Sequence, residues 1–339
     1  MWAFHTDVRP IWNEPRPEVA AQQAAGNTFI VTRLQSRKPD EGIPVFATKD
    51  LPGYHSLDPN AHPFPVRLHR DATGAGGLAL HGGAIDPNLS PRAREYLVDL
   101  DLGEWLTPNH PQADALWFSS LAIAYAPVWL DENEEAILDD WPRVPLPNDA
   151  ERLISSAALG RRIADLLDPD TPLEGVTSGT IIPSLRRIAV LEKVGGGSAS
   201  AADLAVTARW GAQDSRGAIM PGPGRIVERE YSGIEAASSA EAALFGDRTR
   251  DIYLNDMVYW CNVPDEVWGF TIGGFQVLKK WLSYRTEAIL GRPLSLTDIN
   301  YFRDTARRLA ALRLLGPELD ENYRVCAEGS YPWRTITLT

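Results

Sequence analysis

The sequence predicts an α+β fold with a mixed or antiparallel β-sheet region and flanking helices. Helical periodicity begins at Ser90-Pro91 and continues to about residue 170. Strand signals dominate from Pro172 to about Tyr231, and helical patterns return afterwards. Because strands and helices occupy separate stretches instead of alternating one by one, the pattern favours the α+β class.

Composition and length are those of an ordinary folded protein. The chain has 339 residues, is 44% hydrophobic and contains 11 Trp. That is enough apolar material for one large core or two modest ones, and the length favours two domains. We predict three segments: a lead-in or junction (1–26), N-terminal strands plus a helical part (27–170), and a β-rich part with C-terminal helices (171–339).

Cysteine, histidine and hydropathy patterns exclude several classes of protein. Cys261 and Cys326 are the only cysteines, and the histidines show no helical i, i+4 pair, so neither a disulfide framework nor a metal site is indicated. No apolar run approaches 18 residues, and charged residues interrupt the N-terminus. We therefore expect a soluble, cytoplasmic protein without a membrane span or signal peptide.

Charge is distributed unevenly along the chain. The net charge is −12, which argues against a general affinity for nucleic acid. Residues 276–313, however, hold eight Lys and Arg against three acids, and residues 175–229 hold seven against four. Basic islands on an acidic protein favour a localised anion site. The alternative is that these charges are solvated helix faces.

Short strands are predicted near the N-terminus. Residues 27–34 (NTFIVTRL) form a β-branched run, and residues 45–47 could pair back with it. Residues 52–65 are proline-rich and predict a loop, and residues 66–69 are a further strand candidate. The Gly-rich stretch 71–91 predicts a variable connection or insertion.

Helices are predicted next. Ser90 can cap a helix that has Pro91 at its first position. Residues 115–129 are strongly apolar and should be buried, whereas the acidic run 131–140 should be a solvated helix face. Asn148 with Glu151 forms a capping signature. The helix that follows should bury Leu153, Ala157 and Ile163, with Gly160 allowing close packing.

The second half of the chain predicts a β-rich region. In order we expect a strand at 187–194, a loop at 195–198, a half-buried strand at 204–210 that points Arg209 outward, a turn at 220–224, a strand at 225–229 and a helix at 236–245.

Residues 260–285 are the stretch around which this region is organised. A strand-like run at 267–272 meets Gly273-Gly274, which suggests a tight turn. An amphipathic helix follows at once. Its apolar stripe comprises Phe275, Val277, Leu278, Trp281 and Leu282, and its other face comprises Gln276, Lys279, Lys280 and Ser283.

A last helix is predicted after residue 294. Ser295 and Asp298 can form a capping box at its start. Its buried face should comprise Ile299, Phe302, Ala306 and Leu309, and its outward face Arg303, Arg307 and Arg308.

Motifs for catalysis are missing. There is no GxxxxGK[ST] phosphate loop, no GxGxxG after a strand, no GxSxG nucleophile elbow and no Pro-Pro-aromatic signature of amino-methyltransferases. A Ser/His hydrolase using Ser198 and His81 is a remote alternative. We expect no catalytic residue in this chain.

Several runs of the sequence resemble one known family, the C-terminal specificity (target recognition) domain of type ISP restriction–modification enzymes. The runs are VTARWG…GAIMPGPGRIVEREY (Val206 to Tyr231), DIYLNDMVYWCNVPDEVWGFTIGGFQVLKKWL (Asp251 to Leu282), LSLTDINYFRD (Leu294 to Asp304), RVPLPNDAERLISSAALGRRIADL (Arg143 to Leu166) and NTFIVTRLQSR (Asn27 to Arg37). The resemblance covers nearly the whole chain from about residue 9, and VPDEVWGFTIGGFQVLKKWL is its most specific piece. It implies a target-recognition-domain-like fold that reads a short duplex DNA site in a phage-defence system.

The resemblance also implies partners. Family members carry a nuclease, a translocating ATPase, a coupler and an adenine methyltransferase ahead of this domain, and this chain lacks all four. S-adenosylmethionine, ATP and Mg are therefore expected only on partner modules, and the expected partners are duplex DNA and a methyltransferase/helicase-nuclease chain. Either a separate gene encodes the specificity part or the chain is a diverged remnant. The alternative function is an assembly subunit of a defence complex that has no DNA reading of its own.

Reading duplex DNA needs phosphate contacts for placement and groove contacts for discrimination. The base-reading candidates are Arg209, Gln213 and Arg216, because Arg can bond guanine and Gln can bond adenine. The phosphate candidates are Arg186, Arg187, Gln276, Lys279, Lys280 and Arg285. A solvated surface charge is the alternative interpretation of each basic residue. Trp210, Trp268 and Trp281 are expected in the core.

Overall fold

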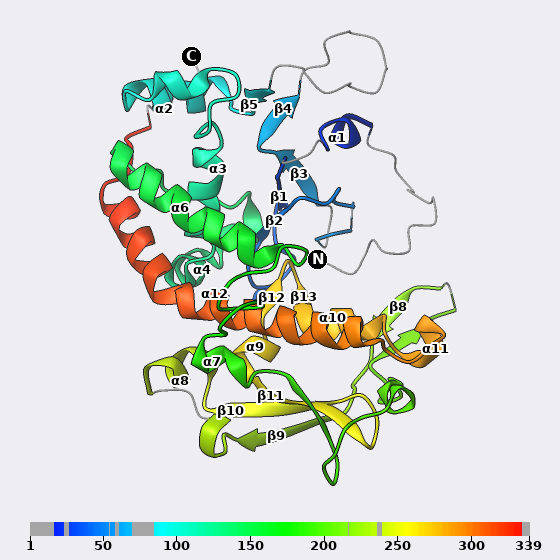
Figure 1. The fold of residues 1–339 in the computed structure, drawn as a ribbon. Helices are drawn as coiled ribbons and strands as arrows, with labels where there is room; N and C mark the ends of the chain where they lie inside the picture. Colours follow the sequence, from blue (N-terminus) through cyan, green and yellow to red (C-terminus); the bar gives the residue numbers. More distant parts are fainter. Residues whose placement is uncertain are drawn as a thin grey trace. The chain divides into compact units, whose positions relative to one another are not determined.

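The computed structural model describes residues 17–23, 27–53, 55–57, 61–69, 85–215, 217–235 and 239–333 (Figure 1). The chain forms two compact units. Among the described residues, we call those within 9–168 and 316–339 the helical unit, and those within 169–315 the sheet unit. The predicted boundary after residue 170 lies two residues from the division after Asp168, while residues 316–339 belong to the helical unit.

A small antiparallel sheet lies in the helical unit. Its strands are β1 (Phe29–Thr32), β2 (Val45–Thr48) and β3 (His62–Pro65), in the order β2-β1-β3. The strand at 27–34 and its pairing with 45–47 are therefore confirmed. The predicted loop at 52–65 is wrong in its last four residues, which form β3. An edge strand tolerates prolines because one side of its backbone needs no ladder partner.

A second ribbon pairs β4 (Arg67–His69) with β5 (Ile85–Pro87). This confirms the strand candidate at 66–69. Residues 70–84 of the Gly-rich stretch lie outside the described residues.

Helices make up most of the helical unit. They are α1 (Pro17–Ala21), α2 (Pro91–Asp99), the 3-10 turn η1 (Gly103–Leu106), α3 (Ala115–Ala124), α4 (Pro127–Asn133), α5 (Ala136–Asp139) and α6 (Ala150–Leu167). The Ser90 hydroxyl accepts a hydrogen bond from Ala93 N, which confirms the predicted cap. The predicted cap at Asn148 is wrong by one residue. Asp149 caps α6 instead, because its carboxylate accepts from Arg152 N at 2.9 Å.

The helical core forms where α3 and α6 cross. Leu153, Ala157 and Ile163 are fully buried, as predicted. Gly160 allows the crossing, since a Cβ at this position would lie only 1.8 Å from the Phe118 carbonyl oxygen. Leu121 and Ile123 of α3 are buried as well, whereas most of the acidic run 131–140 is exposed.

A four-stranded antiparallel sheet forms the centre of the sheet unit. Its order is β6-β11-β10-β9, with β6 at Val190–Lys193, β9 at Ile226–Glu230, β10 at Arg248–Tyr253 and β11 at Val258–Pro264. Figure 1 shows β9, β10 and β11 side by side. The remaining elements are α7 (Pro183–Arg186), η2 (Ala201–Leu204), β7 (Gly211–Gln213), β8 (Ile219–Pro221), η3 (Gly233–Glu235), α8 (Ser239–Phe245), α9 (Asp265–Trp268), β12 (Thr271–Ile272), β13 (Phe275–Gln276), α10 (Val277–Ser283), α11 (Glu287–Leu290) and α12 (Leu296–Glu328).

Two predicted strands take other forms. Residues 204–210 alternate in burial as expected, but they have no ladder partner. Thr207 N and Ala208 N both donate to the Leu254 carbonyl, so this segment runs irregularly along the end of β10. In the strand-like run predicted at 267–272, residues 267–268 belong instead to the helix α9, because Pro264 and two acids favour a helix start there. Residues 271–272 of the same run do form a strand, β12.

Strand and turn limits also shift. The predicted strand at 187–194 begins only at Val190, and Arg187 caps α7. The predicted turn at 220–224 begins inside β8, so its first two residues belong to a strand. The strand at 225–229 and the helix within 236–245 are confirmed by β9 and α8, although residues 236–238 lie outside the described residues.

The tight turn at Gly273-Gly274 is confirmed. Both residues have positive φ, +53° and +83°, and they join β12 to β13. A two-residue hairpin of this kind needs left-handed backbone at both positions, which glycine adopts without strain. The helix α10 follows after two strand residues. Ser283, predicted on its polar face, is buried, and its hydroxyl donates to the Lys280 carbonyl.

The last helix confirms its predicted start and buried face, but of the three residues predicted to face outward only Arg303 is partly exposed. Ser295 and Asp298 bond reciprocally, as a capping box requires. Arg307 and Arg308 are buried, because their guanidinium groups donate to the carbonyls of Arg186 and Thr171. The helix runs from Leu296 to Glu328 and includes Pro317.

The core of the sheet unit is aromatic. Trp260 stacks on Phe302 with ring centroids 3.9 Å apart, and Trp210 meets Trp268 edge to face. Trp210, Trp268 and Trp281 are all buried, as predicted. No helix in the described part of the chain combines the length and apolar character that a membrane span requires.

Candidate functional site

The hairpin of β7 and β8 packs against α10 in the sheet unit. The contact is close, because a Cβ at Gly211 would lie 1.9 Å from the Ser283 carbonyl oxygen. The base-reading candidates at this hairpin and the lysines of α10 are therefore carried by neighbouring elements. Figure 1 labels β8 and α10 in the same part of the sheet unit.

Arg209 lies immediately before this hairpin and is exposed. Its φ of +56° places it in the left-handed region, which an L-residue other than Asn or Asp rarely adopts. The backbone around it is fixed. Its carbonyl accepts from Gly224 N at 3.3 Å, and the next carbonyl, that of Trp210, accepts from Gly222 N at 2.6 Å. The Trp210 indole donates to the Tyr253 carbonyl at 2.7 Å and so holds the segment to β10.

Gln213 ends β7 and is also exposed. Its amide donates to the Gly217 carbonyl at 3.1 Å across the hairpin loop. Asp214 stabilises the same loop by accepting from Ala218 N at 2.8 Å. Arg216, the third base-reading candidate, lies outside the described residues. The described part of the loop therefore presents the amide side chain of Gln213.

The phosphate candidates around α10 differ in how they are bonded. Lys279 is partly exposed, and the Lys280 ammonium lies 4.8 Å from the ring centroid of Phe275. Gln276 donates to the Trp268 carbonyl at 2.6 Å, so its amide ties α10 to α9. Arg285 lies over Trp281 at 5.0 Å and 4.0 Å from the Asp298 carboxylate. The two lysines are thus the better placed cations.

Arg186 and Arg187 occupy the end of α7, before the sheet strand β6. Both are exposed. The Arg186 guanidinium donates to the Ile181 carbonyl at 3.3 Å, within the same turn. These two residues form a second basic position on the sheet unit, carried by a different element from the lysines of α10.

Charge pairing distinguishes five of the candidates from the other basic residues, which include the candidate Arg285. The sequence of the sheet-unit segment 169–315 holds seventeen Lys and Arg against seventeen Asp and Glu. Most of the described Lys and Arg side chains in this segment lie within 4.0 Å of a carboxylate: Lys193, Arg225, Arg229, Arg248, Arg250, Arg285, Arg292, Arg303 and Arg313. In the described part of this segment, Arg186, Arg187, Arg209, Lys279 and Lys280 are exposed or partly exposed without such a partner.

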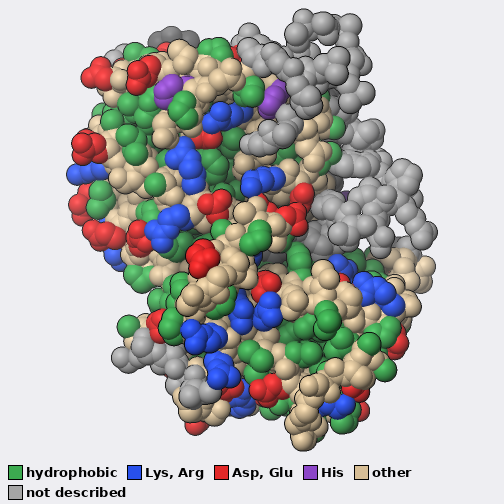
Figure 2. Space-filling view, in the orientation of Figure 1, with side chains coloured by type: hydrophobic (Ala, Val, Ile, Leu, Met, Phe, Trp, Pro, Cys, Tyr) green, Lys and Arg blue, Asp and Glu red, His purple; other side chains and the backbone are tan. Residues whose placement is uncertain are grey.

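Ion pairing and burial therefore leave fewer accessible cations in the basic stretches than their sequence alone indicates. In residues 276–313 most of the positive charge is paired or buried, and the two lysines of α10 remain. Figure 2 shows Lys and Arg scattered among Asp and Glu on the face in view, without one continuous basic area. An anion would meet individual cations on rigid elements and not a general basic coat.

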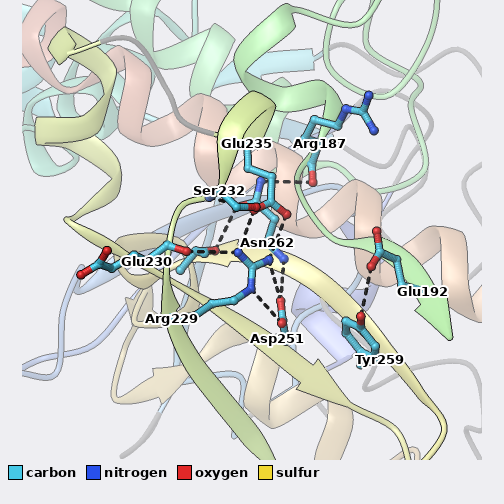
Figure 3. A network of polar contacts seen from close by, with 10 residues as sticks. Arg187, Glu192, Arg229, Glu230, Ser232, Glu235, Asp251, Tyr259 and Asn262 are labelled. Carbon is cyan, nitrogen blue, oxygen red and sulfur yellow. Dashed lines mark hydrogen bonds and ion pairs between the residues drawn. The ribbon is translucent and has the colours of Figure 1, made fainter. Parts of the chain in front are cut away.

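A polar network that the sequence did not indicate lies on β9 and β10. Arg229 bonds Asp251 at 2.8 Å and Glu235 at 2.7 Å, and the Ser232 hydroxyl donates to Glu235 at 2.6 Å (Figure 3). Burial raises the pKa of Glu235, but the bonds from Arg229 and Ser232 outweigh it and hold that pKa below its usual value. Only the register of β9 on β10 brings Asp251 to Arg229, so a single sequence gives no signal for this pair.

Other chemistry is sparse. Ser198 lies in the exposed loop after Gly197, and His81 lies outside the described residues. No group of three His, Cys, Asp or Glu suited to a metal occurs among the residues that the structure describes. Burial, followed by the charge of Glu192, raises the pKa of the Cys261 thiol, which keeps it protonated at neutral pH.

The sequence of this chain matches a known protein family. Residues 2–312 match the family model of the Type ISP C-terminal specificity domain. No curated protein matches the chain.

Solved structures give weaker likenesses. The ATP-dependent Type ISP restriction-modification enzyme LlaBIII bound to DNA is 12% identical, with a TM-score of 0.44 over 88% of this chain and 16% of that one. A nuclease-deletion mutant of the Type ISP enzyme LlaGI with a DNA substrate mimic is 12% identical, with a TM-score of 0.42 over 88% of this chain and 21% of that one. The DrdV–DNA complex is 16% identical, with a TM-score of 0.45 over 94% and 26%. The chain thus spans about a quarter or less of the length of these proteins.

Proposed function

Since the chain belongs to the Type ISP C-terminal specificity domain family, we propose that it binds duplex DNA sequence-specifically and provides target recognition in a restriction–modification system. The observation that carries this proposal is the set of five basic residues without a carboxylate partner in the described sheet unit. The sequence segment 169–315 of this unit holds equal numbers of basic and acidic residues, yet these five basic residues lie apart from the carboxylates.

The two kinds of DNA contact are divided between elements. Lys279, Lys280, Arg186 and Arg187 lie at helices and would bond phosphate oxygens, which set position and orientation without reading sequence. Arg209 and Gln213 lie at a hairpin whose backbone is fixed by glycines, and they would reach base edges. Arg bonds guanine and Gln bonds adenine in a bidentate manner, each with about 1–3 kcal/mol of discrimination.

The chain would act with partner modules. An adenine methyltransferase and a translocase–nuclease of the same system would bind S-adenosylmethionine, ATP and Mg, and this chain would direct them to a DNA site during phage defence. It would contribute no catalytic residue.

A salt titration tests the proposal. The full chain is mixed with fluorescent duplexes that contain randomised sites, and its affinity is measured by anisotropy between about 50 and 200 mM salt. We expect the double substitution K279A/K280A to reduce the log–log slope by about 1.8, because each phosphate contact contributes about 0.9. R248A/R292A removes the same charge from ion-paired, exposed positions and should leave the slope nearly unchanged.

Two results would contradict the proposal. One is that no duplex binds at low salt, even with the co-encoded methyltransferase–translocase chain present. The other is that both double variants reduce the slope equally, which would assign binding to net charge alone. The alternative, an assembly subunit, predicts a different result for a variant without the Arg209 and Gln213 side chains. That variant would still assemble with its partner and would keep the site preference of the complex.

A further inference from the structure

Buried side chains on either side of Arg186 and Arg187 anchor the backbone that carries them. Leu185 and Ile188, on either side of the pair, are almost completely buried, and they anchor the turn in the core. The two arginine side chains between them are exposed. The sequence thus mounts two neighbouring cations on a turn whose flanking residues cannot move independently of the core.

Both arginine carbonyls accept hydrogen bonds from distant buried residues. Arg307 of α12 donates to the Arg186 carbonyl at 2.8 Å, and the Asn262 amide donates to the Arg187 carbonyl at 3.3 Å. Arg307 and Asn262 are 8% and 2% exposed. A third bond runs from Ala189 N to the Asn262 carbonyl at 3.4 Å. Figure 3 shows the Arg187 carbonyl directed at Asn262 and its guanidinium directed away.

Asn262 is itself placed by an irregularity in the sheet. Two residues of β11, Cys261 and Asn262, face the single residue Asp251 of β10, because the register shifts there. Such a bulge redirects a side chain. Asn262 adopts a φ of +55°, which asparagine tolerates at low cost.

The amide of Asn262 has a fixed orientation. Its oxygen accepts from the buried Thr249 hydroxyl at 3.0 Å, so its nitrogen must face the Arg187 carbonyl. Its backbone N–H donates to Asp251 at 3.1 Å, and Asp251 is held in turn by Arg229. The network in Figure 3 therefore connects the sheet to the arginine turn through one side chain.

We propose that Asn262 and Arg307 are positioning residues that hold Arg186 and Arg187 as a preset anchor for DNA phosphates. The inference rests on the proposed function and adds to it the residues that orient one of its contacts. Fixing the backbone reduces the conformational freedom that the two arginines lose on binding, which favours a defined register over loose attraction.

The test is a double-mutant cycle in the salt titration. N262G removes the amide but keeps the left-handed backbone, because glycine adopts positive φ freely. R186A/R187A should reduce the log–log slope by about 1.8. We expect N262G alone to reduce the log–log slope by a large part of the amount, about 1.8, that is expected for R186A/R187A. Added to R186A/R187A, N262G should reduce the slope no further. Added to K279A/K280A, it should reduce the slope by as much as it does in the wild-type chain.

A second variant keeps the test decisive if N262G fails to fold. R307M replaces the buried guanidinium with an apolar side chain of similar length, a change that interiors often tolerate. It removes the bond to the Arg186 carbonyl and should show the same pattern of non-additivity. Hydrogen exchange of residues 186–189 should accelerate in either variant.

The outcomes separate this inference from the proposed function. If the wild-type chain binds no duplex, both are overturned. If R186A/R187A lowers the slope while folded N262G and R307M leave it at the wild-type value, the positioning role is overturned and DNA binding stands. An N262G effect of equal size in every background would also overturn it, since that is the behaviour of general destabilisation.

Discussion

Arg209 is the residue whose conformation is hardest to explain by folding alone. Among the described non-glycine residues with positive φ, the others are Asp, Asn or the buried Ala189. A left-handed conformation costs an ordinary L-residue about 1–2 kcal/mol, and glycine would avoid that cost. The Arg209 carbonyl accepts a hydrogen bond from Gly224 N, but the exposed side chain has no carboxylate partner within the described chain. Strain of this kind is concentrated at functional sites.

Substitutions at Arg209 should separate stability from recognition. We predict that R209G is more stable than R209A by about 1 kcal/mol, because only glycine relieves the left-handed strain. Both should lose discrimination at one base pair, by about 1–3 kcal/mol. Urea unfolding measures the first effect and selection from a randomised duplex library the second. A selection profile identical to wild type in both variants would exclude Arg209 from base reading.

Asp203 gives a residue-scale prediction about pH. The Lys193 ammonium and the Ser200 backbone and hydroxyl donate to its carboxylate and lower its pKa to about 2. The unfolded value is about 3.9, so the stabilisation is complete above pH 4 and is lost as the pH falls toward 2. We predict that the free energy of unfolding falls less in D203N than in the wild type between pH 5 and pH 2.5. Equal losses in urea unfolding at these two pH values would contradict this.

At the scale of elements, the crossing of α3 and α6 depends on Gly160. Alanine usually stabilises a helix by about 1 kcal/mol relative to glycine. In G160A the new methyl would overlap the Phe118 carbonyl, so we predict a net loss of about 1–3 kcal/mol. S155A, on the exposed side of the same helix, should change stability by less than about 0.5 kcal/mol. Thermal unfolding of both variants decides whether the crossing is as close as described.

Elements with a local cause were predictable from the sequence. The Gly273-Gly274 turn, the Ser90 cap and the Ser295 capping box depend on residues within a few positions of one another. Residues 267–268 were misassigned because a short apolar run fits a strand and a buried helix equally well. Residues 204–210 alternate like a strand, but whether a neighbour is present to pair with them depends on the tertiary fold.

The candidate site was predictable only in part, for a related reason. Periodicity assigned Arg307 and Arg308 to an outward face, because arginine is seldom buried. In the fold both residues are buried, and the backbone carbonyls of Arg186 in α7 and of Thr171 accept hydrogen bonds from their guanidinium groups. Asn262 carried no signal at all, since its role depends on a register shift between β10 and β11.

At the scale of the whole molecule, the negative charge lies outside the segment that carries the candidate site. Residues 169–315 are neutral by sequence, so the net charge of −12 comes from the rest of the chain. Acidic surface repels DNA phosphates over about 30 Å at 0.01 M salt but over only about 8 Å at physiological salt. Repulsion of this kind suppresses non-specific binding more than specific binding, because specific contacts are short-range.

Removing acids from the helical unit should test this effect. Asp131, Glu135 and Asp139 are exposed on α4, α5 and the turn between them. We predict that D131N/E135Q/D139N strengthens binding to unrelated duplex DNA severalfold at about 10 mM salt and has little effect at about 150 mM. Anisotropy with one specific and one unrelated duplex measures both. An unchanged affinity for unrelated DNA at low salt would show that these acids do not act at a distance.

The two cysteines make the chain convenient for single-site labelling. Cys261 and Cys326 are 5% and 1% exposed, so a thiol reagent will reach them slowly in the folded state. Ser198 follows three glycines whose missing side chains would meet nothing within 4 Å, in an exposed loop after β6. S198C would therefore supply an accessible thiol without removal of the native ones. A fluorophore there would let each variant above be followed with the dye on the protein and the DNA unmodified.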